Sequence, residues 1–327
     1  MDALSDVLRA VRLTGAVFFD VRASEPWVAE TPAGCDIVGT IFPDAEHLIS
    51  YHVVTAGTCW ACAIGDEPIQ LSVGDVIVFP HGDAHVMSSA PGMREPPDLT
   101  RFRHPSNGQL PFSMSMGPSD TAPANLVCGF LGCDARPFNP VLEALPNVIR
   151  VSDRAGGAIA AFVQFAVAES KARRIGGECV LGHLSELMFV DVVRQYLETL
   201  PADRTGWLAG LREPFVGRAL TALHQTPARD WTIEALAHDV GLSRSALAER
   251  FTQFVGQPPM QYLASWRMQL AANHLLSGMD NVATVAARVG YESEAAFSRA
   301  FKKAVGSPPS QWRKRRASAL PTGVATV

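Results

Sequence analysis

The 327-residue sequence has no long hydrophobic run, and only 18% of its residues are charged. No apolar stretch approaches the roughly 20 residues that a membrane-spanning helix needs. The N-terminus Met-Asp-Ala-Leu-Ser-Asp lacks the basic start and apolar core of a secretory signal. We therefore expect a cytoplasmic protein that does not enter a membrane. Six cysteines in a chain of this length are more typical of reduced thiols than of a disulfide framework.

Charge is distributed unevenly along the chain, although the net charge is only -4. From Ala209 onward there are fourteen Lys and Arg against eight Asp and Glu, whereas the preceding part has fourteen against twenty-four. The length allows two domains with full cores. The basic C-terminal part is therefore the candidate for contact with a polyanion such as nucleic acid.

A unit of about twenty residues occurs twice in this basic part, starting at Ile233 and at Val282. Each copy has two short apolar-periodic segments around a glycine, Gly241 or Gly290, which suits a turn with positive φ. A serine follows each turn, Ser243 or Ser293, and can cap the next helix. This pattern predicts two helix-turn-helix units, the arrangement that places a helix in the DNA major groove.

The i,i+4 pairs Leu247 with Phe251 and Phe297 with Phe301 should face the core of each unit. The opposite side of each second helix then faces outward. The DNA-binding candidates on and beside these outward faces are Arg244, Ser245, Ala248 and Glu249 in the first unit, and Ser293, Glu294, Ala295, Ser298, Arg299, Lys302 and Lys303 in the second.

These candidates predict different kinds of contact. Arg244, Lys302 and Lys303 suit phosphates, and Arg299 suits a guanine edge. Glu249 could accept a hydrogen bond from cytosine N4, or could instead form a salt bridge on the protein surface.

The N-terminal part predicts a β-structure with helices appended to it. Apolar runs broken at short intervals predict strands over 16–21, 37–42, 48–54, 59–64, 75–79 and 125–130, as in an antiparallel barrel or sandwich. The stretch 88–124 is rich in Pro, Gly, Ser and Met, and is either a lid or a disordered excursion.

Two helices are expected over about 155–173 and 178–200. A stripe of Leu181, Leu184, Met188, Val192 and Tyr196 on the second helix is either core or a dimerisation face.

Residues from about 211 to 312 resemble the AraC/XylS family of transcription regulators. The resemblance lies in Trp231-Thr232-Ile233, Gly241-Leu242-Ser243, Gly256-Gln257-Pro258-Pro259, Val289-Gly290-Tyr291, Phe297-Ser298-Arg299-Ala300-Phe301-Lys302 and Gly306-Ser307-Pro308-Pro309. It implies two helix-turn-helix subdomains joined by one long helix, here about 260–276. It also implies double-stranded DNA, a homodimer and RNA polymerase as partners.

The N-terminal part is similar to the cupin-type sensor domain of some members of this family. Gly74 to His85 fits the motif G-x5-P-x-G-x2-H, which implies that His85 points into a barrel. His52, His81 and His85 are therefore the candidate effector-binding residues. Catalytic cupins carry two histidines and a glutamate in their first motif, whereas this strand has only His52. Two histidines leave a divalent metal short of ligands, so we expect no metal, no cofactor and no enzymatic activity.

The cysteines leave open a second kind of signal, an oxidant that reacts with thiols. Cys59 and Cys62 would point to opposite faces of a strand, which argues against a bond between them. Cys128 and Cys133 flank a predicted turn and are the better disulfide candidates, although small buried thiols are the favoured interpretation of these cysteines. Cys59, Cys128 and Cys133 are therefore the possible redox residues.

Together these features predict an α+β protein of two domains. Residues 1–200 would form a cupin-like β-barrel with a helix pair that senses a small-molecule effector and dimerises. A linker over 201–208 would join it to an all-α tandem helix-turn-helix domain over 209–316, followed by a tail over 317–327. The expected function is sequence-specific transcription regulation. Two alternatives remain: a metal-dependent cupin enzyme or metal sensor with a DNA tether, and a thiol-based oxidant sensor.

Overall fold

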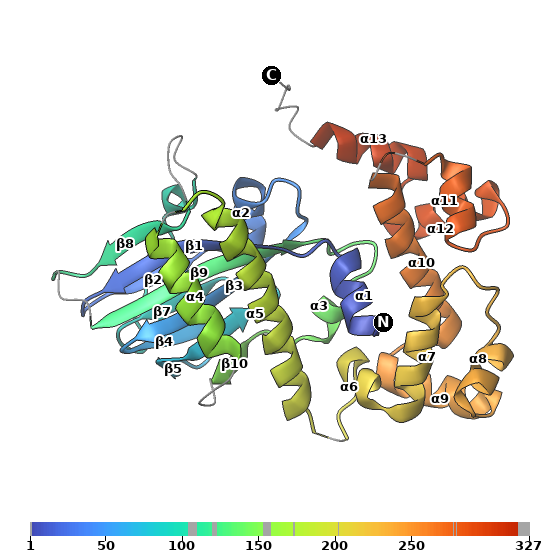
Figure 1. Cartoon of the computed structure of the whole chain (residues 1–327), viewed down its shortest axis with the longest axis horizontal. Coiled ribbons are helices and arrows are strands. Elements are labelled where there is room, and N and C mark those ends of the chain that lie inside the picture. The colour runs from blue at the N-terminus through green and yellow to red at the C-terminus, as the bar shows by residue number, and fades with distance from the viewer. Residues whose placement is uncertain are drawn as a thin grey trace. The chain divides into compact units, whose positions relative to one another are not determined.

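The computed structural model divides the chain into two compact units (Figure 1). The sheet unit comprises Leu13–Cys133 and Leu145–Thr199, and the helical unit comprises Met1–Arg12, Asp134–Ala144 and Leu200–Val327. The structure describes residues 2–103, 110–119, 123–152, 158–172, 174–201, 203–276, 278 and 280–319, so most of the expected C-terminal tail lies outside it. Within these ranges, no helix combines the length and apolarity needed to cross a membrane.

The sheet unit holds two sheets whose inner faces enclose its main core. The six-stranded sheet has the order β10-β6-β3-β9-β1-β8, and the four-stranded sheet has the order β2-β7-β4-β5. The strands are β1 (Thr14–Ala23), β2 (Val28–Thr31), β3 (His47–Ala56), β4 (Thr58–Ala63), β5 (Ile69–Ser72), β6 (Asp75–Phe79), β7 (His85–Ser88), β8 (Phe112–Met116), β9 (Ala124–Cys133) and β10 (Ile149–Ser152). The described strands therefore pair as an open sandwich rather than one closed barrel, and β8 pairs with β1 in parallel.

The strand predicted over 37–42 was wrong, because this segment is helix α2 (Gly34–Ile41). Ile37 and Ile41 are buried four residues apart while Gly39 and Thr40 are exposed, which is the period of a helix. A short apolar run does not by itself distinguish a strand from a helix.

The strands expected at 16–21, 48–54, 59–64, 75–79 and 125–130 are confirmed as β1, β3, β4, β6 and β9. Within the stretch expected to be irregular, strand β8 and the short helix η1 (Leu99–Phe102) are ordered, and residues 104–109 and 120–122 lie outside the described part.

Two helices cover the outer face of the six-stranded sheet, α4 (Ala158–Ala172) and α5 (Gly177–Thr199) (Figure 1). Leu181, Met188 and Val192 of the predicted stripe are buried, with Leu181 packed on Val17 and Val127 of the sheet. A Cβ added at Gly15 would lie 2.5 Å from the Gly182 carbonyl oxygen, so both glycines permit a close approach of α5 to β1. This stripe is therefore core.

The helical unit is larger than the predicted DNA-binding domain. Its helices are α1 (Ala3–Ala10), α3 (Pro140–Ala144), α6 (Trp207–Arg212), α7 (Pro214–Gln225), α8 (Ile233–Val240), α9 (Arg244–Val255), α10 (Pro259–Leu276), α11 (Val282–Arg288), α12 (Glu294–Val305) and α13 (Pro309–Ala319). Contacts place residues 1–12 and 134–144 in this unit, whereas the sequence assigned them to the N-terminal domain.

Gln269 of α10 explains this grouping, because it is fully buried and joins both residues 1–12 and residues 134–144 to α10. Its side-chain nitrogen donates to the Ala10 carbonyl at 3.0 Å, and its oxygen accepts from the Phe138 amide at 3.1 Å. Asn273 donates to the same Ala10 carbonyl at 2.8 Å. The N-terminal helix and the segment before α3 are thus structural parts of the helical unit.

Candidate nucleic-acid interface and effector pocket

The two predicted helix-turn-helix units are present and are built alike. Gly241 and Gly290 adopt φ values of 77° and 80°. The Ser243 hydroxyl accepts from the Ala246 amide, and the Ser293 hydroxyl accepts from the Ala296 amide, each at 3.2 Å. These caps start α9 and α12 at the predicted residues and leave the first turn of each helix available to a groove.

In α9, Leu247 and Phe251 are fully buried and therefore fix the outward face. Ser245 and Glu249 are exposed there and Ala248 is half-buried. No ion pair involves Glu249 within the part of the chain that the structure describes, so the surface salt bridge considered for it is not formed here. Arg244 is exposed and forms an ion pair with Glu234 at 3.0 Å.

In α12, Phe297 and Phe301 are fully buried within a core shared with α10, α11 and α13. Five of the predicted residues on this helix are exposed, and Ser298 is half-buried. The exposed residues are Glu294, Ala295, Arg299, Lys302 and Lys303, and the capping Ser293 is exposed as well. The outward face of α12 thus carries three cations and one carboxylate, a balance that suits a polyanion.

Helix α10 joins the two helix-turn-helix units, and Arg267 on α10 fixes the spacing between them. The Arg267 guanidinium donates to the carbonyls of Pro227 at 2.7 Å and Arg229 at 2.8 Å, in the loop before the first unit. The same guanidinium lies 5.8 Å from the ring centre of Tyr291 in the second unit. Arg267 is a positioning residue. It is among the residues that carry the family resemblance, but the sequence did not indicate its role, because its partners lie far away in the chain.

The predicted histidines of the sheet unit lie in different places. His85 on β7 and His52 on β3 come from opposite sheets, and their Nε2 atoms are 2.8 Å apart. His85 also bonds through Nδ1 to the Asp83 carbonyl at 2.8 Å and stacks on Phe79. His81 is exposed and bonds through Nε2 to the Leu145 carbonyl at 3.0 Å. The structure therefore brings His52 and His85 together and separates His81 from them.

Burial keeps both inner histidines neutral at neutral pH. It lowers the pKa of His85 to about 4 and lowers the pKa of His52 well below its usual value, with the neighbouring ring adding to the second effect. Their hydrogen bond to each other occupies the nitrogens that would otherwise point at a shared metal. Within the described residues, no group of three or more metal-ligating side chains occurs.

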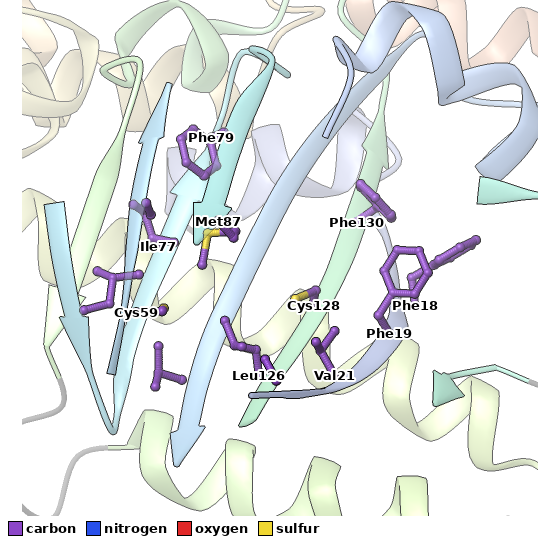
Figure 2. Packing of buried hydrophobic residues seen from close by; sticks show 14 of the residues in the cluster. Phe18, Phe19, Val21, Cys59, Ile77, Phe79, Met87, Leu126, Cys128 and Phe130 are labelled. Atoms are coloured by element: carbon purple, nitrogen blue, oxygen red, sulfur yellow. The ribbon is translucent and has the colours of Figure 1, made fainter. Parts of the chain in front are cut away.

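An apolar pocket opens beside His52, between the two sheets. Its wall comes mainly from β1, β8 and β9 of one sheet and from β2 and β7 of the other. The residues lining it are Phe19, Val21, Trp27, Ala29, Glu30, Thr31, His52, Met87, Asp98, Arg101, Phe102, Met114, Met116, Leu126, Cys128 and Phe130. Figure 2 shows Leu126, Cys128 and Phe130 along β9 with Val21 and Phe19 on the neighbouring β1. Phe102 of η1 adds a ring from the stretch 88–124, for which either a lid or a disordered excursion was expected.

The cysteines are all free thiols. Cys128 and Cys133 lie on the single strand β9, so the turn predicted between them was wrong, and five residues of strand separate their Cα atoms by about 16 Å. Burial raises the pKa of Cys59 to about 12 and raises that of Cys128 above its usual range. Since the thiolate is the reactive form, these two thiols lack the activation of an oxidant sensor.

Comparisons with known proteins found relatives for both parts of the chain. A family model described as "Cupin" matches residues 2–198, and one described as "Helix-turn-helix domain" matches residues 236–315. A putative AraC-like transcription regulator of Streptomyces lividans is 34% identical over 96% of this chain and 98% of its own length. One from Streptomyces antibioticus is 33% identical over 96% of this chain and 99% of its own. The solved DNA-binding domain of AdpA in complex with a target DNA is 28% identical over 34% of this chain and 98% of that chain, with a TM-score of 0.32.

Proposed function

Because the chain belongs to the family of AraC-like transcription regulators that combine a cupin domain with a helix-turn-helix domain, we propose that a small molecule bound in the pocket beside His52 controls its binding to DNA. The chain is a DNA-binding transcription regulator, as its relatives are. The observation that supports control by an effector is the apolar pocket between the two sheets. A transcription regulator needs no catalytic group, and we propose that this chain is not an enzyme.

We propose that the sheet unit within residues 1–200 senses the effector and dimerises. Residues 1–12 and 134–144 belong instead to the helical unit. We propose that 201–208 link the sheet unit to the DNA-binding residues 209–316, and that 317–327 form a tail. A contact with RNA polymerase is part of the same proposal. Thiol sensing through Cys59, Cys128 or Cys133 is a weaker alternative, because the first two thiols are protonated at neutral pH.

On DNA, we propose that the exposed residues of α9 and α12 divide into two groups. Arg299 makes no hydrogen bond or ion pair with the described residues, so its guanidinium is available for a bidentate contact with guanine. The same group includes Ala295 and Ser298, which lie beside Arg299 on α12. It also includes Ser245, Ala248 and Glu249 at the matching positions of α9. Lys302 and Lys303, in the last turn of α12, are placed for phosphates, together with Arg244 at the start of α9.

Arg299→Ala is expected to weaken binding to the preferred DNA by about 1–3 kcal/mol, because a bidentate base contact is lost. The preference at one base pair should relax while binding to unrelated DNA changes little. Lys302→Ala is the matched control on the same helix, and should weaken all sequences alike and reduce the salt dependence by about one unit. Fluorescence anisotropy against a set of single-base variants separates the two. Equal losses for every sequence in Arg299→Ala would make Arg299 a phosphate contact.

We propose that α4 and α5 dimerise through a face other than the predicted stripe. Phe165 on α4 and Leu187 on α5 are 51% and 52% exposed, and Val180 on α5 is 37% exposed. Since α4 and α5 pack against each other, these exposed side chains lie on adjacent helices. Large apolar side chains gathered on adjacent helices are typical of a protein interface.

Leu187→Asp combined with Phe165→Asp is expected to weaken self-association by about tenfold or more, because each change places a charge in an apolar interface. Val73→Asp is the control, since Val73 is 61% exposed in the sheet unit but lies outside the helix pair. Sedimentation equilibrium measures the effect. A double variant that associates as the wild type does would place the dimer interface elsewhere.

A further inference from the structure

The hydrogen bonds around His85 determine which nitrogen of His52 carries a proton. The Asp83 carbonyl can only accept, so His85 Nδ1 carries a hydrogen and donates to it. His85 is neutral, and its Nε2 therefore has a lone pair and accepts from His52 Nε2. Since His52 is neutral too, its only hydrogen is on Nε2, and its Nδ1 presents a lone pair.

This lone pair is buried and unused. His52 is 6% exposed, and its Nδ1 is buried without a hydrogen-bond partner among the residues that the structure describes. A buried acceptor without a donor is destabilising, so a native structure that keeps one needs a reason. His52 is also one of the side chains that line the apolar pocket. A molecule in the pocket can therefore supply the missing donor.

The rest of the pocket sets the other properties of that molecule. Its wall is mostly aromatic rings, methionines and aliphatic side chains. The charged residues at its rim are already paired: Glu30 with Arg94 at 2.8 Å, and Arg101 with Glu95 and Asp98, each at 3.4 Å. Arg101 is the one cation among the described residues that line the pocket, and two carboxylates already share it, so it is not available to bind an anionic group. A carboxylate next to His52 would meet a lone pair instead of a donor.

We propose that the effector pocket takes a neutral, mainly apolar molecule with one hydroxyl or N–H group, and that this group donates a hydrogen bond to His52 Nδ1. This inference rests on the proposed role of the pocket and adds the chemical class of its ligand. His85 and Asp83 act as positioning residues, because together they hold His52 in the tautomer that accepts at Nδ1. Thr31 is the other buried polar side chain in the wall and has no part in this contact.

The test compares matched probes on the full chain: 4-propylphenol, 1-fluoro-4-propylbenzene, which has nearly the same shape but no donor, and 4-propylbenzoate. Isothermal titration calorimetry should show the phenol binding about tenfold more tightly than the fluoro compound, as expected for one buried hydrogen bond. The benzoate should bind more weakly than the phenol. In His52→Phe the preference for the phenol should fall to about one, and in the control Thr31→Val it should persist.

If His52→Phe does not fold, nitrogen NMR on the wild-type protein tests the same hydrogen bond. The Nδ1 signal of His52 should shift when the phenol binds and should remain in place with the fluoro compound. Equal affinity for these two probes, or a preference that persists in folded His52→Phe, would overturn the donor inference while leaving the pocket as an apolar effector site. Failure of all three probes to bind would overturn the pocket as an effector site, and the inference with it.

Discussion

Gly290→Ala is expected to destabilise the helical unit by about 2–5 kcal/mol, with two causes that add. Gly290 has a φ of 80°, a conformation that is unfavourable for any residue with a Cβ. An added Cβ would also lie 2.7 Å from the Ala228 carbonyl oxygen and 2.9 Å from a nitrogen of Arg267. The backbone of the turn therefore has to move, and the loop at Ala228 with it. Urea denaturation followed by circular dichroism measures the loss.

The first unit provides the matched control. Gly241 occupies the same position of the repeat with a φ of 77°, but a Cβ there would meet no atom within 4 Å. Gly241→Ala should therefore cost only the conformational part, about 1–2 kcal/mol. Similar losses in the two variants would show that the Ala228 contact does not constrain the second turn. Arg267 and Ala228 connect the two helix-turn-helix units. Gly290→Ala should therefore also impair binding to DNA sites that span both α9 and α12.

Val7→Asp is expected to cost about 3–5 kcal/mol, because it removes helix α1 from the helical unit. Val7 is fully buried and Leu4 and Leu8 are each 8% exposed, so one face of α1 is core. A carboxylate cannot remain in that core unpaired, and the helix would detach. Gln269 and Asn273 would then lose their bonds to the Ala10 carbonyl. Hydrogen exchange should show faster exchange of the α10 amides.

Arg9→Ala is the control on the same helix, since the Arg9 side chain is 64% exposed whereas Val7 is fully buried. It should change stability by less than about 1 kcal/mol. Normal exchange of the α10 amides in Val7→Asp would show that α10 does not depend on α1. A fragment that begins near residue 207 would lack both α1 and residues 134–144, so the structure predicts that its α7 and α10 have an uncovered face.

The helix-turn-helix units were predictable in detail because their determinants are local. A capping serine, a glycine with positive φ and two aromatic or aliphatic side chains four residues apart all act within one or two helical turns. The inward position of His85 was implied by the resemblance of Gly74 to His85 to a cupin motif. Cys59 and Cys62 point to opposite faces of β4, as strand geometry requires.

The sequence alone thus determined the family, the two recognition helices, their outward faces and the strand that carries His85. Only the tertiary structure decided four further contacts. His52 meets His85 across two sheets, and Gly290 lies close to the backbone of Ala228. Arg267 joins the two helix-turn-helix units, and α1 packs with α10. Each of these contacts joins segments that are far apart in the chain. Local periodicity is set by neighbours within a few residues, whereas these pairings depend on how complete sheets and helices bury their apolar faces together.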